Sequence, residues 1–457
     1  MIKYLRLAHI GPAASLEVEE FGQRLNLFTG DNGLGKTFLL DACWYALTRT
    51  WADGKQFYPL PEALKKPSPA IDYVIIGKNG KEAKNTAEFQ YRDQSWVRKQ
   101  ARPPIPGLVI YARIDGGFSV WDPARNYWHD DKNEDGRERP PAYQFTKDQV
   151  WDGLEEGEGK QKKIICNGLL RDVEGWRARN NGSFALLGGV LEGLSEGERE
   201  TLKFGEGVRV RLDDVRDIPT LKLPYGQVPV TQAAAGMRRV LALAYLLVWA
   251  WEEHVRAARL QKDVPTNRIV VLFDEVEAHL HPKWQRVFLP SLIKVVDGLL
   301  VKGQVEAISG NSAKHPNKRA ASLLKKIPRS VQIIATTHAP LVLASSETVW
   351  NQSSDKLFDF DLDANRQVRL EEVDFAKHGS AVNWLTSESF DMTTAYSVTA
   401  EQAMERADAF MRQHPNPDTA PPEEKKAIHA KLNAALGGDD EYWPYWLPYF
   451  ERAKAKA

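Results

Sequence analysis

Three glycines, a lysine and a threonine lie close together near the start of the 457-residue chain. They satisfy the pattern GxxxxGK[ST], which runs from Gly30 to Thr37. Glycines allow successive backbone N–H groups to point toward one ligand, and such groups at a helix N-terminus bind polyphosphate. The pattern therefore predicts a nucleotide-binding loop, with Lys36 on the β- and γ-phosphates and the Thr37 hydroxyl on Mg²⁺. The residues expected to contact the nucleotide in this loop are Gly30, Asn32, Gly33, Gly35, Lys36 and Thr37.

A strand and a helix must position this loop. Residues 24–28 (RLNLF) have the composition of a short buried strand, and residues 37–49 (TFLLDACWYALTR) have the apolar spacing of an amphipathic helix. The order strand, loop, helix is the one that phosphate binding at a helix N-terminus requires.

Two acidic residues follow a second apolar strand. Residues 269–273 form an uninterrupted apolar run, which predicts a central parallel strand covered on both faces, and Asp274 and Glu275 come directly after it. Ligands bind at the carboxyl ends of the strands in open α/β sheets. We therefore expect Asp274 to hold Mg²⁺ through its water shell and Glu275 to polarise the water that attacks a phosphate.

Three histidines lie near these acids in the sequence or in the predicted sheet. Residues 331–335 predict another apolar strand, so His338, just beyond it, should emerge at the same sheet edge and contact the γ-phosphate. His279 and His281 stand two residues apart in a loop, a spacing that does not place two imidazoles on one helix face, and no third metal ligand is evident in the sequence. We expect these two to be structural or to contact another subunit rather than to bind a metal.

Together these segments resemble the ABC-type ATPase heads of the SMC/RecF/OLD group, in which a Walker A loop, a Walker B strand ending in Asp-Glu and a switch histidine occur in this order. DEVEAHLHPKWQ (274–285) and ATTHAPLVL (335–343) look most similar to the stand-alone AAA ATPases of prokaryotic defence and overcoming-lysogenisation systems, including Septu-type ATPases. The resemblance covers residues 1–50 and 225–350. It implies ATP and Mg²⁺ as cofactors, and a dimer in which a signature loop of one subunit caps the ATP held by the other.

Two stretches compete for the signature loop. LSEGER (194–199) matches an LSGGQ-like motif by letter, whereas TQAAAGMRRVLALAYLLVWAWEEH (231–254) matches by architecture, because it opens a long apolar helix that leads to the second strand. Since the loop must present helix N-terminal amides to phosphate, we assign it to Ala234, Ala235 and Gly236, and interpret LSEGER as a helix cap or turn. Ala235 and Gly236 should contact the nucleotide, while Ala234 stands where the family usually has serine, so one hydroxyl contact is missing.

The fold class expected from these segments is α/β: a P-loop NTPase of the ABC-type ATPase head kind, with an elaborated lobe, an α-rich C-terminal region and no long coiled coil. The head should span residues 1–350, with residues 50–225 inserted as a lobe whose strands lie at sheet edges. Residues 351–457 should form a hairpin and a helical region. The long heptad repeats that a coiled-coil arm needs are lacking.

The C-terminal region contains two distinctive stretches. KLFDFDLDANRQVRLEEVDF (356–375) alternates apolar and acidic residues, which predicts a hairpin and explains Asp359, Asp361 and Asp363 without the metal site of a nuclease. Six aromatic residues within 442–450 should pack on the region's own core or, as the alternative, anchor a partner.

Composition limits the kinds of partner. The chain has 61 Lys plus Arg and 61 Asp plus Glu, so no net field attracts nucleic acid or an acidic membrane, and such binding needs a local patch. Residues 313–330 are basic and should be a solvated face or, as the alternative, contact a DNA or RNA backbone. With only Cys43 and Cys166 as cysteines, and no apolar run of about 18 residues, we expect a cytoplasmic protein that does not enter the membrane.

The interpretation that joins these observations is an ATP- and Mg²⁺-dependent ATPase that forms a homodimer or a higher homo-oligomer. By resemblance it would be the sensor or motor subunit of a bacterial anti-phage defence system, acting with a separate effector chain such as an HNH-type nuclease. Two other functions stay open: a RecF-like DNA-repair ATPase, and a nucleotide-controlled scaffold that holds a toxic partner inactive. The catalytic residues in the first interpretation are Lys36, Glu275 and His338.

Overall fold

A computed structural model describes most of the chain, which divides into two compact units. The described residues are 1–59, 68–78, 80–98, 104–127, 142–157, 159, 162–180, 182–195, 201–309, 329–387, 390 and 392–452. Contacts between residues separate unit 1, Met1–Ala381, from unit 2, Val382–Ala457.

Unit 1 is built on an eight-stranded sheet with the strand order β20-β19-β3-β18-β17-β7-β8-β9. The five neighbouring strands from β19 to β7 run parallel, while β20, β8 and β9 are antiparallel to their neighbours. Every residue of β17 is buried, as expected for a strand covered on both faces. In sheet order the bounds are β20 (Val368–Val373), β19 (Asp355–Leu362), β3 (Leu25–Gly30), β18 (Ser330–Thr336), β17 (Arg268–Phe273), β7 (Leu108–Ala112), β8 (Phe118–Trp121) and β9 (Tyr143–Phe145).

Three strands that the apolar runs predict are confirmed in this sheet, namely β3, β17 and β18. Their register places Ile333 of β18 beside Leu25 of β3 on one side and beside Val271 of β17 on the other. Because the three strands are parallel, the polar residues that follow them meet at one edge of the sheet.

Two further segments lie inside this sheet although the sequence suggests a peripheral position for them. β7 pairs with β17 on one side and β8 on the other, so the prediction that it lies at a sheet edge is wrong; its five consecutive buried residues are typical of an interior strand. The hairpin predicted over residues 356–375 is confirmed as β19 and β20, and β19 pairs with β3. The hairpin therefore belongs to unit 1, and the contacts divide the chain after Ala381 rather than after residue 350.

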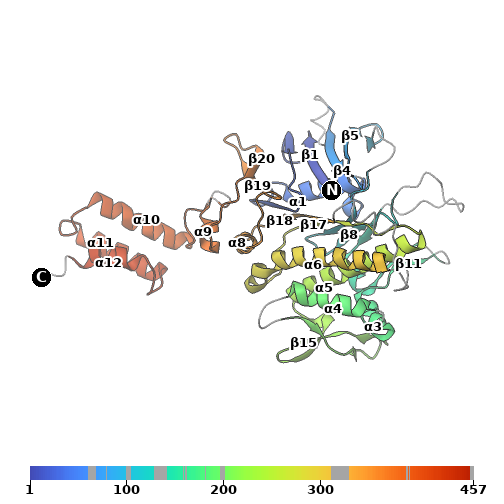
Figure 1. The fold of residues 1–457 in the computed structure, drawn as a ribbon. Coiled ribbons are helices and arrows are strands. Elements are labelled where there is room, and N and C mark those ends of the chain that lie inside the picture. Colours follow the sequence, from blue (N-terminus) through green and yellow to red (C-terminus); the bar gives the residue numbers. More distant parts are fainter. Residues whose placement is uncertain are drawn as a thin grey trace. The chain divides into compact units, whose positions relative to one another are not determined.

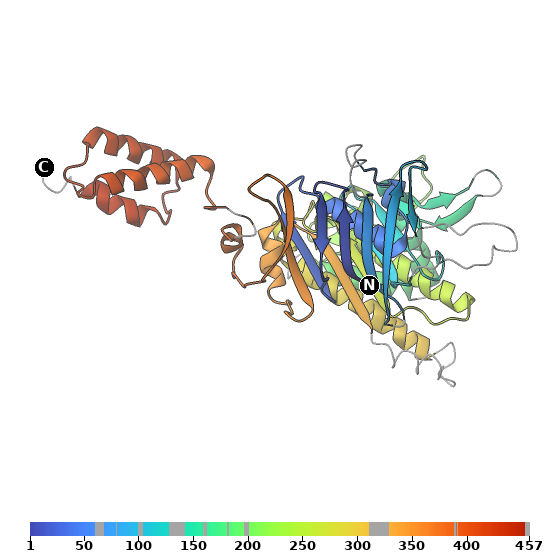
Figure 2. The same ribbon diagram turned by 90° about the horizontal axis from the view of Figure 1, so that it is seen from above.

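Helix α1 (Lys36–Thr48) lies between the main sheet and a second, antiparallel sheet (Figure 1). It contacts β1 and β4 on one side and β17 and β18 on the other. Most of its residues are buried, so apolar burial on both sides holds its first turn beside the end of β3. Seen from above, the strands of the second sheet lie side by side (Figure 2). In sheet order they are β2 (Ser15–Val18), β1 (Ile2–Ala8), β4 (Ala70–Ile76), β5 (Glu82–Gln90) and β6 (Ser95–Arg98).

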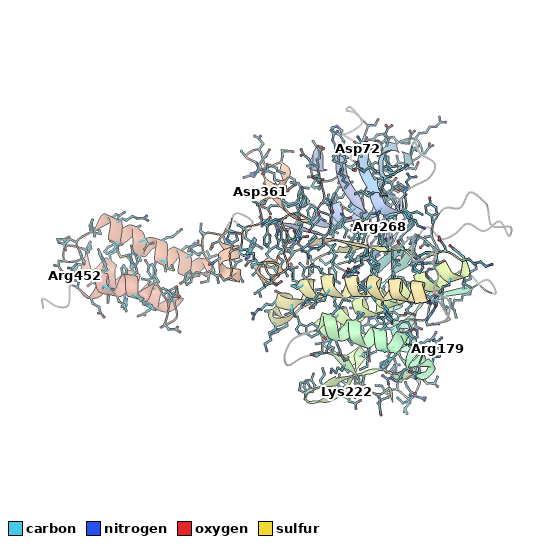
Figure 3. The ribbon with its side chains drawn as sticks, viewed as in Figure 1. Asp72, Arg179, Lys222, Arg268, Asp361 and Arg452 are labelled. Carbon is cyan, nitrogen blue, oxygen red and sulfur yellow. The ribbon has the colours of Figure 1, made fainter. Side chains whose placement is uncertain are left out.

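Two long helices cover the opposite face of the main sheet. α5 (Ala235–Leu260) contacts β7, and α6 (Pro282–Ser309) contacts β17 and β18. α4 (Ser183–Leu194) packs against both helices. Asp72 on β4 and Lys222 on β15 mark the outer layers of unit 1 (Figure 3). The remaining elements of unit 1 are η1 (Ala52–Gly54), α2 (Lys147–Asp152), β10 (Leu154–Glu156), β11 (Lys163–Cys166), α3 (Leu169–Arg179), β12 (Lys203–Phe204), β13 (Val208–Arg209), β14 (Asp217–Ile218), β15 (Thr220–Leu223), β16 (Gly226–Pro229), η4 (Val230–Gln232) and α8 (Pro340–Ser346).

Unit 2 is a small helical unit with a core of its own. The C-terminal aromatic cluster contributes Tyr442, Trp443 and Trp446 to this core, and Trp446 is fully buried, whereas Tyr445 is 62% exposed. Most of the cluster therefore packs on its own core, the first of the two alternatives considered. The helices from the unit boundary onward are α9 (Ala381–Leu385), α10 (Val398–Gln413), α11 (Pro422–Ala435) and α12 (Trp443–Glu451).

Two sequence predictions fall largely outside the described residues: residues 196–199 of LSEGER, and residues 313–328 of the basic stretch. Within the described residues the longest helix is α6, with 28 residues, and no long coiled coil occurs there, as predicted. No helix in that part of the chain combines the length and apolar character needed to cross a bilayer.

Candidate functional site

The predicted phosphate loop connects β3 to α1 at the carboxyl edge of the main sheet. β3 ends at Gly30, and α1 begins at Lys36, directly after Gly35. Gly30 and Gly35 have φ angles of 116° and 106°, which residues with side chains rarely adopt. A Cβ atom on Gly30 would also lie 2.1 Å from the carbonyl oxygen of Phe360. Both positions therefore require glycine, and the predicted order of strand, loop and helix is confirmed.

Lys36 folds back over its own loop. Its Nζ atom donates hydrogen bonds to the carbonyl oxygens of Gly30 and Asp31, both at 2.7 Å. Burial lowers the pKa of the Lys36 ammonium group to about 8, although nearby carboxylates, Glu275 most strongly, act in the opposite direction. The loop thus holds a buried cation where the phosphates are expected.

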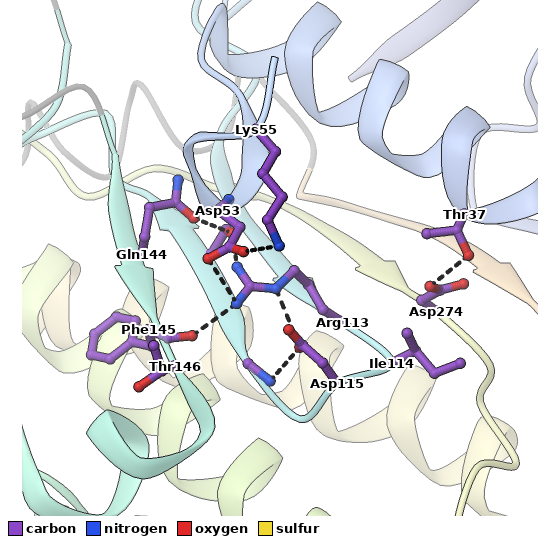
Figure 4. A network of polar contacts seen from close by, with 12 residues as sticks. Thr37, Asp53, Lys55, Arg113, Ile114, Asp115, Gln144, Phe145, Thr146 and Asp274 are labelled. Atoms are coloured by element: carbon purple, nitrogen blue, oxygen red, sulfur yellow. Dashed lines mark hydrogen bonds and ion pairs between the residues drawn. The ribbon is translucent and has the colours of Figure 1, made fainter. Parts of the chain in front are cut away.

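Side chains join the start of α1 to the end of β17. Thr37 Oγ1 donates a hydrogen bond to Asp274 Oδ2 at 2.9 Å, although 237 positions separate the two residues (Figure 4). Thr336 Oγ1 donates to the other carboxylate oxygen at 2.8 Å. Asp274 is buried, and burial raises the pKa of its carboxyl group. A hydroxyl beside a carboxylate supplies the oxygen ligands that Mg²⁺ prefers, so Thr37 and Asp274 fit the predicted metal role.

Glu275 occupies a tight turn directly after Asp274. Its φ angle is 49°, in the left-handed region that few residues other than glycine adopt. Its backbone N–H donates to Thr336 Oγ1 at 2.8 Å, which holds the turn against β18. Burial, followed by the charge of Glu277, raises the pKa of the Glu275 carboxyl group. A partly exposed carboxylate with a raised pKa suits the proton acceptance predicted for Glu275.

His338 lies at the same edge. Its Nε2 atom is 3.8 Å from Glu275 Oε1. Burial, followed by the charge of Lys36, lowers the pKa of the imidazole and so favours its neutral form. The Glu277 carboxylate accepts hydrogen bonds from the backbone N–H of His338 and, at 2.8 Å, from Thr337 Oγ1. This role of Glu277 is not predicted above; the signal for it in the sequence is a third acid two residues after Glu275.

A further carboxylate beside the loop comes from β19. Thr29 Oγ1 donates a hydrogen bond to Asp359 Oδ1 at 2.8 Å, because β19 pairs in parallel register with β3. Burial raises the pKa of Asp359 to about 6, and the charge of Lys36 acts against this shift. Strand alternation explains Asp359 in the sequence, and only the pairing of β19 with β3 reveals its place beside the phosphate loop.

A polar network flanks the site where β7 ends. The backbone N–H of Asp274 donates to the last carbonyl of β7 at 2.9 Å, so Arg113, the next residue, lies level with the two acids. The Arg113 guanidinium lies 3.5 Å from Asp53 and 3.3 Å from Asp115, and donates to the Phe145 carbonyl at 3.1 Å (Figure 4). These contacts connect η1, β7 and β9, and no motif in the sequence signals them.

The predicted signature residues begin helix α5. Ala234 is the N-cap residue, and Ala235 and Gly236 form part of the first turn. Ala234 and Ala235 are exposed. A Cβ atom on Gly236 would lie 2.6 Å from the carbonyl oxygen of His279, which indicates close approach of the two backbones. This helix start therefore lies against the loop that follows Glu275.

His281, in the same loop, receives a local hydrogen bond: its Nδ1 accepts from the backbone N–H of Lys283 at 3.2 Å, at the start of α6. His279 has a φ angle of 63°. Among the described residues, no group of three or more His, Cys, Asp and Glu side chains is arranged to hold a metal ion.

The sheet order, the phosphate loop and the acids at the carboxyl edge define a P-loop ATPase of the α/β class, as predicted. Residues 25–344 match the family described as "AAA domain, putative AbiEii toxin, Type IV TA system". Because the match covers more than half of the chain, the chain belongs to this family of AAA ATPase domains. No protein of curated function matches the chain in sequence.

Several solved structures are similar to the chain at low sequence identity. The SMC head domain from Thermotoga maritima is 13% identical, with 82% of this chain and 99% of that chain covered and a TM-score of 0.35. An SmcHead bound to the C-winged helix domain of ScpA is 12% identical, with 81% and 97% covered and a TM-score of 0.39. The recombination mediator protein RecF is 10% identical, with 82% and 98% covered and a TM-score of 0.37.

Proposed function

We propose that the chain hydrolyses ATP in the presence of Mg²⁺ at the carboxyl edge of its main sheet. The observation that carries this proposal is the direct contact of Thr37 Oγ1 with Asp274 Oδ2 at 2.9 Å, next to Glu275 and His338. The contact joins the phosphate loop to the acids that hydrolysis needs, and the residues follow three separate strands of one sheet, β3, β17 and β18.

Each residue at this edge has a distinct task in the proposed reaction. Lys36 would bind the β- and γ-phosphates of ATP, and Thr37 and Asp274 would hold Mg²⁺. When bound, Mg²⁺ supplies positive charge that offsets the charge of the phosphates. Glu275 would accept a proton from the attacking water, and its raised pKa brings its basicity nearer to neutral pH. His338, as a neutral imidazole, would donate a hydrogen bond to the γ-phosphate.

The active form that we propose is a head-to-tail homodimer. Ala234 and Ala235 are exposed at the start of α5, where the backbone N–H groups of the first turn have no partner within the helix. These amides, with Gly236 among them, would cap the triphosphate bound by a second copy. Ala234 supplies no side-chain hydroxyl, so the capping would depend on the backbone.

The wider role that we propose is a cytoplasmic sensor or motor subunit of an anti-phage defence system, in the manner of Septu-type ATPases. The family description, which refers to a toxin of a toxin–antitoxin system, supports a role in which nucleotide turnover controls a toxic activity. The toxic activity would belong to a separate effector chain, such as an HNH-type nuclease. A pull-down of the chain from its native host, with mass spectrometry of the bound proteins, tests for that effector.

Replacement of the proposed base tests the reaction. Glu275→Gln should lower ATP turnover about 100- to 1000-fold, the loss typical of a group that acts in the transition state, and leave ATP affinity unchanged. Light scattering should then detect a stable ATP-bound dimer. The matched control is Glu371→Gln, which removes a carboxylate of 54% exposure from β20 and should leave turnover intact.

Two experimental outcomes would contradict this proposal, and each would favour one of the two alternative functions. ATP bound by the wild-type chain without turnover, although Glu275 is intact, would favour the nucleotide-controlled scaffold. Turnover that rises on addition of duplex DNA would favour a RecF-like repair ATPase, and the salt dependence of that DNA binding would measure the contribution of basic side chains.

A further inference from the structure

Arg239 connects the start of α5 to the turn that carries Glu275. Its Nη2 atom donates hydrogen bonds to the carbonyl oxygens of Asp274 at 2.8 Å and Glu275 at 3.0 Å. Its Nη1 atom donates to the carbonyl oxygen of Ile114 at 3.4 Å. The guanidinium also lies 5.3 Å from the ring centre of Phe273, within cation–π distance. One side chain of α5 therefore contacts the end of β17 through two carbonyls and an aromatic ring.

The turn that Arg239 holds is conformationally unfavourable. Glu275 has a φ angle of 49°, and such residues persist where the surrounding contacts hold them in place. Thr336 Oγ1 accepts the hydrogen bond of the Glu275 backbone N–H at 2.8 Å, and Arg239 binds the carbonyl oxygen of the same residue. The backbone N–H of Glu275 is thus held by Thr336 of β18, and its carbonyl oxygen is held by Arg239 of α5. A shift of either element would turn the Glu275 carboxylate.

The position of Arg239 on α5 connects this turn to the proposed dimer contact. Arg239 lies three residues after Gly236, within the first turns of the helix. From Val240 to Trp251 every residue of α5 is buried, so the core anchors the helix body, whereas Ala235 in the first turn is exposed. A contact at Ala235 and Gly236 would therefore act on Arg239 within about one helical turn.

We propose that Arg239 is a positioning residue that couples closure of a second copy over the start of α5 to the orientation of Glu275 in the same chain. This inference rests on the proposed head-to-tail dimer. In that dimer the ATP bound by one copy would contact the start of α5 in the second copy. Arg239 of the second copy would then change the position of the turn that carries Glu275 in that same copy. The two sites should therefore hydrolyse ATP cooperatively.

The test compares ATP affinity, kcat and the Hill coefficient of turnover in the wild-type chain and in Arg239→Lys and Arg239→Gln. The wild-type chain should show a Hill coefficient above 1. Both variants should keep ATP affinity within about twofold, because Arg239 does not contact the phosphate loop, and should lose about 10- to 100-fold in kcat through misplacement of Glu275. Their Hill coefficients should fall to 1. Lysine has a shorter side chain that ends in a single nitrogen, so it should not restore the contacts that Nη1 and Nη2 of Arg239 make with three carbonyl oxygens.

Arg256→Gln is the matched control. It removes a guanidinium from the same helix, where Arg256 pairs with Glu253 at 2.6 Å, far along α5 from the catalytic edge. This variant should keep both the wild-type kcat and the wild-type Hill coefficient. Thermal unfolding of all variants separates loss of positioning from loss of fold, and if Arg239→Gln fails to fold, Arg239→Lys carries the test.

The inference and the proposed function fail in different ways. A wild-type chain that neither dimerises nor turns over ATP would overturn the proposed function. A wild-type dimer with normal turnover but a Hill coefficient of 1 would overturn only the coupling by Arg239. Arg239 variants that fold and keep kcat and cooperativity would do the same, as would variants that lose thermal stability alone.

Discussion

The carboxyl edge of the main sheet, which is the proposed catalytic edge of unit 1, and the helical core of unit 2 hold polar groups differently. At the catalytic edge, Lys36 and Asp274 are buried with their charged forms disfavoured, and Glu275 has a positive φ angle. In unit 2, Trp446 Nε1 donates to His429 Nδ1 at 3.2 Å, and among the described residues of this unit none has a positive φ angle.

This difference indicates that unit 2 is optimised for packing and the catalytic edge for binding a ligand. In unit 2 polar groups pair within the core, as Trp446 Nε1 does with His429 Nδ1. The buried Lys425 Nζ has no hydrogen-bond partner among the described residues and lies over the Tyr449 ring at 5.1 Å. The groups at the catalytic edge are held ready for a charged ligand, at some expense in stability. The two regions should therefore respond differently to substitution and to pH.

The largest effect should follow removal of the buried cation. Lys36→Ala should weaken ATP binding at least about 100-fold, because a charged hydrogen-bond donor to phosphate typically contributes about 1.5–3 kcal/mol per bond. Isothermal titration calorimetry measures the affinity. Lys78→Ala, which removes a lysine of 52% exposure, is the control and should bind ATP normally. Retained ATP affinity in Lys36→Ala would refute the loop as the phosphate site.

The next effect concerns unit 2 and should leave catalysis untouched. Trp446→Ala should lower the free energy of unfolding of unit 2 by about 3–5 kcal/mol, since it empties a fully buried site in the core. Hydrogen exchange of α10, α11 and α12 measures this loss, and ATP turnover should stay at the wild-type value. A parallel loss of turnover would mean that the catalytic edge depends on unit 2.

A smaller effect should appear as a pH dependence of ATP binding. Burial lowers the Lys36 pKa to about 8, so the cation is present below that pH and is lost as pH rises through it. ATP affinity should fall by up to about tenfold per pH unit beyond pH 8, and binding there should take up a proton. Calorimetry in buffers of different ionisation enthalpy detects the proton. Lys36→Arg keeps its charge at these pH values, so a pH dependence that persists in this variant would assign the effect to another group.

The smallest effect concerns two neighbouring residues of α12, Tyr445 and Trp446. Tyr445→Ala should change the stability of unit 2 by less than about 0.5 kcal/mol, because Tyr445 is 62% exposed whereas its neighbour Trp446 is buried. Chemical denaturation measures the change. If Tyr445→Ala keeps its stability but loses a co-purifying protein, the aromatic cluster contains a partner anchor as well as a core.

The parts of the fold that the sequence predicts well are local. The strand before the phosphate loop, the helix after it and the two strands that end at the catalytic edge are confirmed, because each is a continuous apolar run with its own turn residues. β7 is an interior strand and not the predicted edge strand, and the hairpin of β19 and β20, predicted for the C-terminal region, pairs with β3 in unit 1. In both cases the element was expected, and its neighbour in the sheet was not.

The residues at the catalytic edge form the same two groups: some are recognisable in the sequence, and others are placed there by contacts with distant segments. The glycines of the loop, Lys36 and the Asp-Glu pair are visible in the sequence, because backbone sterics and phosphate chemistry impose their types and spacing. Asp359 and Arg239 are not visible, because each reaches the site through a partner far away in the chain: Asp359 meets Thr29 across 330 positions, and Arg239 meets Asp274 across 35.

By itself, then, the sequence determined the chemistry of this protein: a phosphate loop, a strand that ends in two acids, and a histidine after another strand. The tertiary structure decided which residues surround that chemistry, through the order of strands in the sheet and the position of α5. The physical reason is that motif geometry follows from the sterics of adjacent residues, whereas strand order and helix placement follow from burial of apolar surface between distant segments.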